Sequence, residues 1–497
     1  MKNLKILIVF LVAIAYSCND AIDIEQPGRL GADQAFQSLT DLQTGLLGAY
    51  ASLDNSGLIQ FSSVFTDEVS IGVDSGGQGL GNGEYGFIVN PGTTAPNAYW
   101  VGAYAALNSF NRLIIASQSI EIDAGEQGEL NEILGQVYAL RAYVNLLIVT
   151  YFSTDMTDNG ALAGILIDFV PGVDEQLPRS TNGEFYAQIT ADLDRAAGLL
   201  TTQSNPTFVS LDFVTAVRAR MEAYRGNYAA ALPLASSLVA SNPLANRAQY
   251  EGVFLDTDNT EIIFKLERTL GDPFDRQAPT GSAAGAGWVG ANYAFVDGTI
   301  DGSPYFEMGR SLFNLLDPAD IRFDVNINET SIISPDYQND PDFAANDVLV
   351  IGKYPGNETE LMNDLKIFRT SEMVMIMAEA YADAGSINGA TNSTAAMIKM
   401  LRDARFGSDQ PLPVYADQTE AFGAILDERR VEFAFEGHRY PDLKRLGERG
   451  NRGVLRDPLD CAVNGACSLP ASDFRFTLPI PIAETNANPD IQQNPGY

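Results

Sequence analysis

Residues 427–445 read DERRVEFAFEGHRYPDLKR, a run in which acidic and basic side chains alternate with aromatic ones. Side chains three or four positions apart on a helix can form ion pairs, so this spacing predicts a helix stabilised by local pairs. The charged residues at helical spacing that could form such pairs are Glu428, Arg429, Arg430, Glu432, Glu436 and Arg439. We expect the helix to end at Gly437, because glycine readily adopts the left-handed conformation that closes helices. We interpret the cluster as a structural clamp rather than a catalytic site.

Composition excludes several classes of protein. The chain has 497 residues, 31 of them Lys or Arg and 64 Asp or Glu, which gives a net charge of −33. Such a charge argues against a nucleic-acid partner, because phosphate binding needs a basic face. The single histidine and three cysteines exclude a multi-histidine metal site and a four-thiolate zinc site. We therefore predict no metal, no cofactor and no catalytic residue.

His438, the only histidine, is expected to be a packed structural residue with the chemistry of a weak pH sensor.

The N-terminus has the pattern of an export signal. Residues 1–17 begin with a basic segment, and the apolar run 6–15 is too short to cross a bilayer about 30 Å thick. The residues before Cys18 resemble a bacterial lipobox, which would make Cys18 the acylated first residue of the mature protein. Residues 18–30 would then be an acidic tether. The alternative is an ordinary signal peptide that contains a cysteine.

Helical periodicity of apolar residues predicts a chain built mainly of α-helices. The predicted helices are 35–53, 130–152, 182–200, 211–224, 228–241, 368–384, 392–406 and 418–435. Two pairs, 211–241 and 378–406, resemble tetratricopeptide hairpins, with a tight turn at 225–228 in the first. Ordinary antiparallel helix pairs would pack in the same way.

Two long segments, about 62–100 and 268–351, are rich in glycine and irregular in pattern. Long loops in a compact protein are usually functional, so we expect the ligand there. Cys461 and Cys467 flank a short loop that contains glycine, and an exported protein meets oxidising conditions. We expect them to form a local disulfide.

Several stretches in a fixed order resemble the SusD/RagB family of outer-membrane lipoproteins. Residues 427–445 match its ERR-x-E-x-x-F-E-G-x-R-x-x-D-L-x-R signature, and residues 140–152 resemble its LRA-(F/Y) helix motif. The tail, with LPIP at 478–481 and QNPGY at 493–497, is similar to the family's ending. The resemblance covers essentially the whole mature chain.

This resemblance implies one SusD-like domain over residues 31–497, mainly α-helical. Four tetratricopeptide-like helical hairpins would support an irregular, loop-rich ligand-binding half. It implies a lipid-anchored protein on the extracellular face of the outer membrane, without catalytic activity. Such proteins capture oligosaccharides, or peptides in some members, and deliver them to a SusC-like TonB-dependent barrel transporter.

Sugars stack on flat aromatic rings, and polar side chains bind their hydroxyls. In the second glycine-rich segment we expect Trp288, Asn292 and Tyr293 to contact ligand, although Trp288 buried beneath its loop is the alternative. Tyr85 and Tyr305 are further candidates, and Trp100 is expected to pack in the core. Only two tryptophans occur in the chain, which keeps peptide cargo open.

Two other classes remain as alternatives. A surface glycoside hydrolase would use a pair of carboxylates, which are abundant here but lie in no recognisable motif. A tetratricopeptide-type adaptor would bind other proteins in a groove on its helices.

Overall fold

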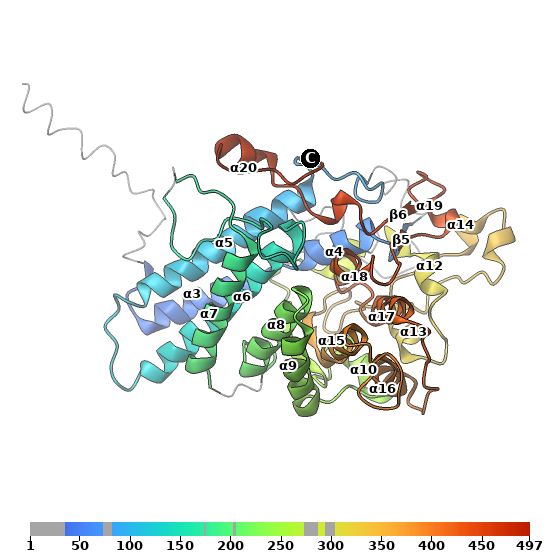
Figure 1. Cartoon of the computed structure of the whole chain (residues 1–497), viewed down its shortest axis with the longest axis horizontal. Coiled ribbons are helices and arrows are strands. Elements are labelled where there is room, and N and C mark those ends of the chain that lie inside the picture. The colour runs from blue at the N-terminus through green and yellow to red at the C-terminus, as the bar shows by residue number, and fades with distance from the viewer. Residues whose placement is uncertain (1–34, 73–81, 173–174, 202–204, 273–286, 294–303) are drawn as a thin grey trace, which may run out of the picture.

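The computed structural model describes residues 35–72, 82–172, 175–201, 205–272, 287–293 and 304–497. Helices dominate these residues, and the strands occur as three two-stranded antiparallel ribbons (Figure 1). The prediction of a mainly α-helical fold is confirmed. The predicted signal peptide, Cys18 and the tether at 18–30 lie outside the described residues.

The N-terminal helices pack together at one end of the molecule, blue to green in Figure 1. Helix α6 (Gln127–Phe152) contacts both α5 (Thr94–Ala116) and α7 (Asn182–Leu199), and α5 also packs on α3 (Leu39–Ser52). By length and composition α6 could cross a membrane, but 78% of its apolar stretch is buried inside the protein. It is therefore best described as the central helix of the core.

Two helix pairs connect this layer to the C-terminal third. Helices α8 (Leu211–Tyr224) and α9 (Tyr228–Ser241) pack together across a turn at Gly226, whose φ of +76° favours glycine. Helix α15 (Thr370–Asp383) packs on α9 and on α16 (Thr394–Phe406). The helices predicted at 211–224 and 228–241 are confirmed at both ends. That these pairs are tetratricopeptide-like stays a prediction.

Several predicted boundaries are wrong. Helix α3 begins at Leu39 rather than at residue 35, and α6 begins at Gln127 rather than at residue 130. Phe368 lies in β4 (Leu365–Arg369), which pairs antiparallel with β2 (Ile262–Leu266), and α15 begins only at Thr370. Helix α17 (Gln418–Glu432) ends before the predicted Gly437. Phe435 and Gly437 have φ values of 62° and 85°, so they form the turn that leads into α18 (Arg439–Leu446).

The two segments predicted to be irregular contain short elements that pair with each other. Strand β1 (Val69–Ile71) of the first runs antiparallel to β3 (Phe306–Met308) of the second, with Ser70 opposite Glu307.

The remaining elements are α4 (Ser56–Phe65), α10 (Arg247–Phe254), α11 (Val289–Tyr293), α12 (Arg310–Phe313), α13 (Ile321–Asn326), η3 (Tyr337–Asn339), α14 (Phe343–Asn346), β5 (Val454–Leu455), α19 (Pro458–Cys461), β6 (Ser468–Leu469), η4 (Phe474–Phe476) and α20 (Ile482–Ala487).

Most of the charged side chains of residues 427–445 are buried and form a structural clamp, as predicted, but most of their partners lie on other elements. Glu432 accepts hydrogen bonds from Arg369 at 2.8 Å and from Arg405 at 2.7 Å. Glu436 pairs with Arg369 and with Lys353, at 2.8 and 2.9 Å. The predicted local pairing is wrong because buried charges need partners on the elements that enclose them.

His438 packs in this region as predicted. Its ring lies 4.6 Å from that of Phe433, and its Nδ1 is 3.2 Å from Arg429 Nη2. Burial, and then the positive charge of Arg429, hold the pKa of His438 well below its usual value. The imidazole is therefore neutral at physiological pH, and its role is packing rather than pH sensing.

Candidate functional site

A cavity of about 280 Å³ lies where the β1–β3 ribbon, the segment around α14 and the disulfide loop meet. Its walls come from three parts of the chain that are far apart in sequence. The lining residues are Ser70, Ile71, Gly72, Glu307, Met308, Phe343, Ala344, Asp347, Leu349, Leu459, Asp460 and Val463. The two segments predicted to carry the ligand site therefore both contribute to this cavity.

The ribbon wall depends on close backbone contact. The Gly72 N–H donates to the Tyr305 carbonyl at 3.0 Å. A Cβ on Gly72 would lie only 1.9 Å from the carbonyl oxygen of Pro304. A side chain at this position would force the two segments apart, so glycine is required by the close approach.

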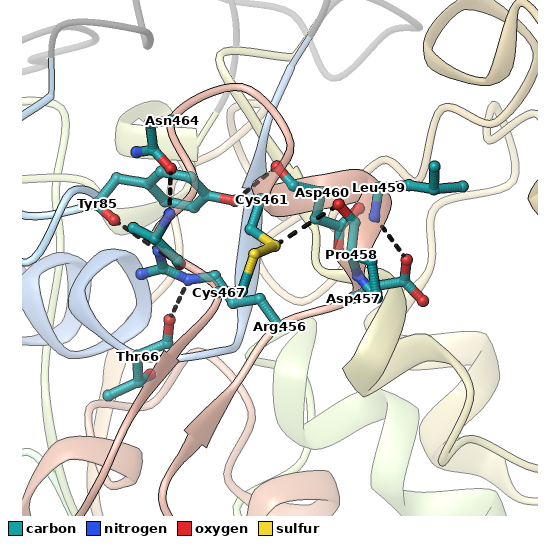
Figure 2. Close-up of a disulfide and its surroundings, with 11 residues drawn as sticks. Thr66, Tyr85, Arg456, Asp457, Pro458, Leu459, Asp460, Cys461, Asn464 and Cys467 are labelled. Carbon is teal, nitrogen blue, oxygen red and sulfur yellow. Dashed lines mark hydrogen bonds between the residues drawn. A yellow bond between two sulfur atoms is a disulfide. The ribbon is translucent and has the colours of Figure 1, made fainter.

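A disulfide between Cys461 and Cys467 holds the third wall, with 5.1 Å between their Cα atoms (Figure 2). The short helix α19 runs into this loop, and the carboxylate of Asp457 caps it by accepting from the Leu459 N–H at 2.9 Å. Cross-linking so short a loop reduces its freedom in the unfolded chain, which stabilises the loop by roughly 2 kcal/mol. Asp460 is thereby fixed at the cavity.

Carboxylates dominate the electrostatics of the cavity. Asp347 accepts two hydrogen bonds from Arg310 Nη1, at 2.8 and 3.0 Å. Asp460 Oδ2 accepts the backbone N–H of Arg310 at 2.7 Å. Burial, reinforced by the negative charges of Asp457 and Asp347, raises the pKa of Asp460 to about 7. Asp460 therefore exists near neutral pH as a mixture of acid and carboxylate.

Two of the predicted ligand contacts lie close to this cavity without lining it. Tyr85 is fully buried beneath the disulfide loop, where its hydroxyl donates to the Asp460 carbonyl at 3.1 Å (Figure 2). The Arg456 guanidinium covers its ring at 3.9 Å. Tyr305 is half-buried, next to β3, with its ring 4.6 Å from that of Phe306.

The other three predicted contacts lie together on or beside α11 and are buried. Trp288 is 6% exposed, and its indole N–H donates to the Thr269 carbonyl at 3.3 Å. The Tyr293 hydroxyl lies 2.9 Å from Ser63 Oγ. The amide of Asn292 is buried with no hydrogen-bond partner among the described residues. A buried ring offers no face to a sugar in this arrangement.

The ligand roles of Trp288, Asn292, Tyr293, Tyr85 and Tyr305 stay predictions. Trp100 is in the core, as predicted, with its ring 4.9 Å from that of Phe152. No local motif contains the cavity residues Glu307, Asp347 and Asp460, so they are not among the predicted site residues. The only sequence feature that could have pointed to any of them is the position of Asp460 directly before Cys461.

Family models match two parts of the chain. The model described as the SusD family matches residues 323–497, and one described as "Starch-binding associating with outer membrane" matches residues 32–221. SusD-like protein P2 of Formosa agariphila is 25% identical over the full length of both chains. Starch-binding protein SusD of Bacteroides thetaiotaomicron is 28% identical over 147 residues, 29% of this chain and 24% of that one.

Solved structures share the fold. A SusD superfamily protein from Bacteroides thetaiotaomicron superposes with a TM-score of 0.74 at 22% identity, covering 92% of this chain and all of that one. A laminarin-binding SusD-like protein gives a TM-score of 0.68 at 20% identity, covering 93% of this chain and all of that one. The helical architecture, the charge clamp of residues 427–445 and these matches agree: the chain belongs to the SusD/RagB family.

Proposed function

We propose that this protein is a nutrient-binding lipoprotein on the extracellular face of the outer membrane. It captures oligosaccharides and delivers them to a SusC-like TonB-dependent transporter, and it performs no catalysis. Family membership supports this role, as do the names of two similar proteins, one starch-binding and one laminarin-binding. The lipobox-like residues before Cys18 support the lipid anchor.

The observation that carries the proposal is the composition of the cavity. Phe343, Met308 and Leu459 supply apolar surface, and Ser70 and Asp460 supply hydrogen-bonding groups. Ligand sites typically combine a mainly apolar lining with a few placed polar groups. This combination suits a sugar, whose C–H faces are apolar and whose hydroxyls need polar partners.

The test is affinity electrophoresis of the protein lacking residues 1–18, in gels that contain one neutral polysaccharide each. We expect retardation by at least one polymer, and Phe343→Ala should weaken it at least about fivefold, because the ring is part of the cavity wall. Phe169→Ala is the matched control, since Phe169 is 37% exposed and is not among the residues that line the cavity. Trp288→Ala tests the earlier ligand prediction separately.

Three outcomes would contradict the proposal in different ways. If no neutral polysaccharide retards the protein, the glycan assignment fails and peptide cargo replaces it. Release of reducing sugar by the purified protein would favour a surface hydrolase instead. Equal effects of Phe343→Ala and Phe169→Ala would remove the cavity from the binding site.

A further inference from the structure

The two aspartates of the cavity differ in how far their oxygens are already occupied. Asp347 uses both oxygens: Oδ1 accepts from the Ser334 N–H at 2.8 Å, and both accept from Arg310 Nη1, at 2.8 and 3.0 Å. Asp460 Oδ2 accepts the backbone N–H of Arg310 at 2.7 Å, whereas Oδ1 has no hydrogen-bond or ion-pair partner in the part of the chain that the structure describes. A carboxylate has about four lone-pair positions, so Asp460 keeps acceptor positions for a ligand.

Asp460 is held in place from several sides (Figure 2). The Tyr85 hydroxyl donates to its carbonyl at 3.1 Å, Asp457 caps the helix α19 that carries it, and the disulfide follows at Cys461. Helix α19 also packs on β1, which brings Asp460 and Ser70 to adjacent walls of the cavity. An acceptor that is fixed before the ligand arrives loses less conformational freedom on binding, so more of its hydrogen-bond energy contributes to affinity.

Sugar hydroxyls are ligand groups that suit this position. A hydroxyl donates its proton to a carboxylate in a charge-assisted hydrogen bond, which is roughly twice as strong as one between neutral groups. Ser70, on the neighbouring wall, supplies a hydroxyl that can donate to a ligand oxygen. Met308, Leu349 and Phe343 supply apolar surface for the C–H face of the same sugar ring.

Asp460 gains or loses its proton near neutral pH, because its pKa is about 7. Burial is the main cause of this raised pKa, and the hydrogen bond from the Arg310 N–H acts in the opposite direction. Strand β1, which packs on α19, carries no ionisable side chain. The charged or titratable groups around Asp460 are Asp457 on its own helix, Asp347 and Glu307 in the cavity walls, the Arg310 guanidinium, and Tyr85 and Arg456 beneath the disulfide loop.

We propose that Asp460 anchors the hydroxyls of a bound glycan through Oδ1, and that its ionised form makes capture stronger above neutral pH than below it. The inference rests on the proposed glycan-binding function and adds a hydroxyl-binding residue and a pH dependence to the same site. Because a donated hydroxyl proton stabilises the carboxylate, a bound glycan lowers the pKa of Asp460 and binding releases a proton.

The experiment is isothermal titration calorimetry with laminarin, a polymer without ionisable groups, at about pH 6 and about pH 8. Any other neutral polymer that retards the protein in gels is used in the same way. Between these pH values the ionised fraction of Asp460 rises from about one-tenth to about nine-tenths. We therefore expect binding to be at least about threefold, and at most about tenfold, tighter at the higher pH.

A second measurement needs no variant. At about pH 7, calorimetry in two buffers of different protonation enthalpy should show release of up to about half a proton for each bound chain.

Asp460→Asn keeps an acceptor for the Arg310 N–H but does not ionise. It should bind at least about threefold more weakly than the wild type at about pH 8, and its affinity should not change with pH. Glu68→Gln is the matched control, because the Glu68 carboxyl also has a pKa of about 7 but is not among the described residues that line the cavity. It should keep the pH dependence of the wild type.

Each outcome decides one question. Equal affinity at both pH values, tighter binding at the lower one, or proton uptake at about pH 7 would overturn the pH dependence while leaving glycan binding intact. A pH dependence that persists in Asp460→Asn, or disappears in Glu68→Gln, would overturn the assignment to Asp460. If no neutral polymer binds at either pH, the proposed function fails and the inference fails with it.

Discussion

At the scale of single residues, buried carboxylates are the most informative feature of the protein. Glu68 is fully buried after α4, where Oε2 accepts from Ser63 Oγ at 2.8 Å and Oε1 from the Phe435 N–H at 3.3 Å. Burial, together with the negative charge of Asp67, raises its pKa to about 7. A carboxyl group with a raised pKa in the folded state makes folding less favourable once it ionises.

This raised pKa predicts that Glu68→Gln increases the free energy of unfolding by an amount that depends on pH. Below the unfolded-state pKa of about 4.5 both states are protonated, and stability is lost as pH rises through the folded-state value of about 7. At about pH 8 the variant should exceed the wild type in free energy of unfolding by up to about 3 kcal/mol, and at about pH 4.5 the difference should vanish. Urea denaturation at both pH values measures this, and a difference independent of pH would contradict it.

Glu432 shows the opposite behaviour. Its carboxylate binds Arg369, Arg405 and Arg322, whose charges outweigh burial and hold the pKa of Glu432 well below its usual range. Removing this charge would leave three buried guanidinium groups short of a partner.

We expect Glu432→Gln to lower the free energy of unfolding by about 3–5 kcal/mol in denaturant titrations. Asp427→Asn, on the same helix, is the control, because Asp427 and its partner Arg452 are both more than one-third exposed. An exposed pair contributes about 1 kcal/mol or less. Similar losses in the two variants would refute the role of the buried clamp.

At the scale of elements, the β1–β3 ribbon decides whether the cavity exists. Gly72→Ala should separate the two segments because of the contact with Pro304, lowering stability by roughly 1–3 kcal/mol and weakening polysaccharide retardation. The control is Gly48→Ala in α3, where a Cβ meets nothing within 4 Å. There alanine should stabilise the helix by up to about 1 kcal/mol and leave retardation unchanged. Retardation unaffected by Gly72→Ala would exclude the ribbon from the site.

Most long helices could be predicted at this scale, whereas short elements could not; the 23-residue helix α5 is the exception, because it is not among the predicted helices and begins inside the segment 62–100 that was predicted to be irregular. Helices α8 and α9 carry an apolar period that identifies them without any tertiary information. Strands β1 and β3 have three residues each and exist through pairing with each other. The sequence near them is rich in glycine, so it indicates a loop and contains no sign of the partner strand.

At the scale of the whole molecule, attachment to the membrane is predicted to depend on Cys18. Acyl chains contribute about 0.8 kcal/mol for each buried CH₂ group, and multiple chains give stable anchoring. Cys18→Ser should therefore move the protein from the membrane fraction to the soluble fraction, with polysaccharide binding unchanged. Cys461→Ser is the control cysteine variant and should remain in the membrane fraction. Retention of Cys18→Ser in the membrane would contradict lipid anchoring at this residue.

The sequence by itself determined the mainly helical class, the approximate positions of eight helices and the family, because apolar periodicity and a long charged signature are local properties of the chain. Tertiary structure alone decided which charges pair, how deeply Trp288 and Tyr85 are buried, and where the cavity lies. Glu432 pairs with Arg369 and Arg405 because enclosing elements must compensate a buried charge. The cavity needs Ser70, Glu307 and Asp460 together, and chain segments so far apart in sequence meet only when the fold closes.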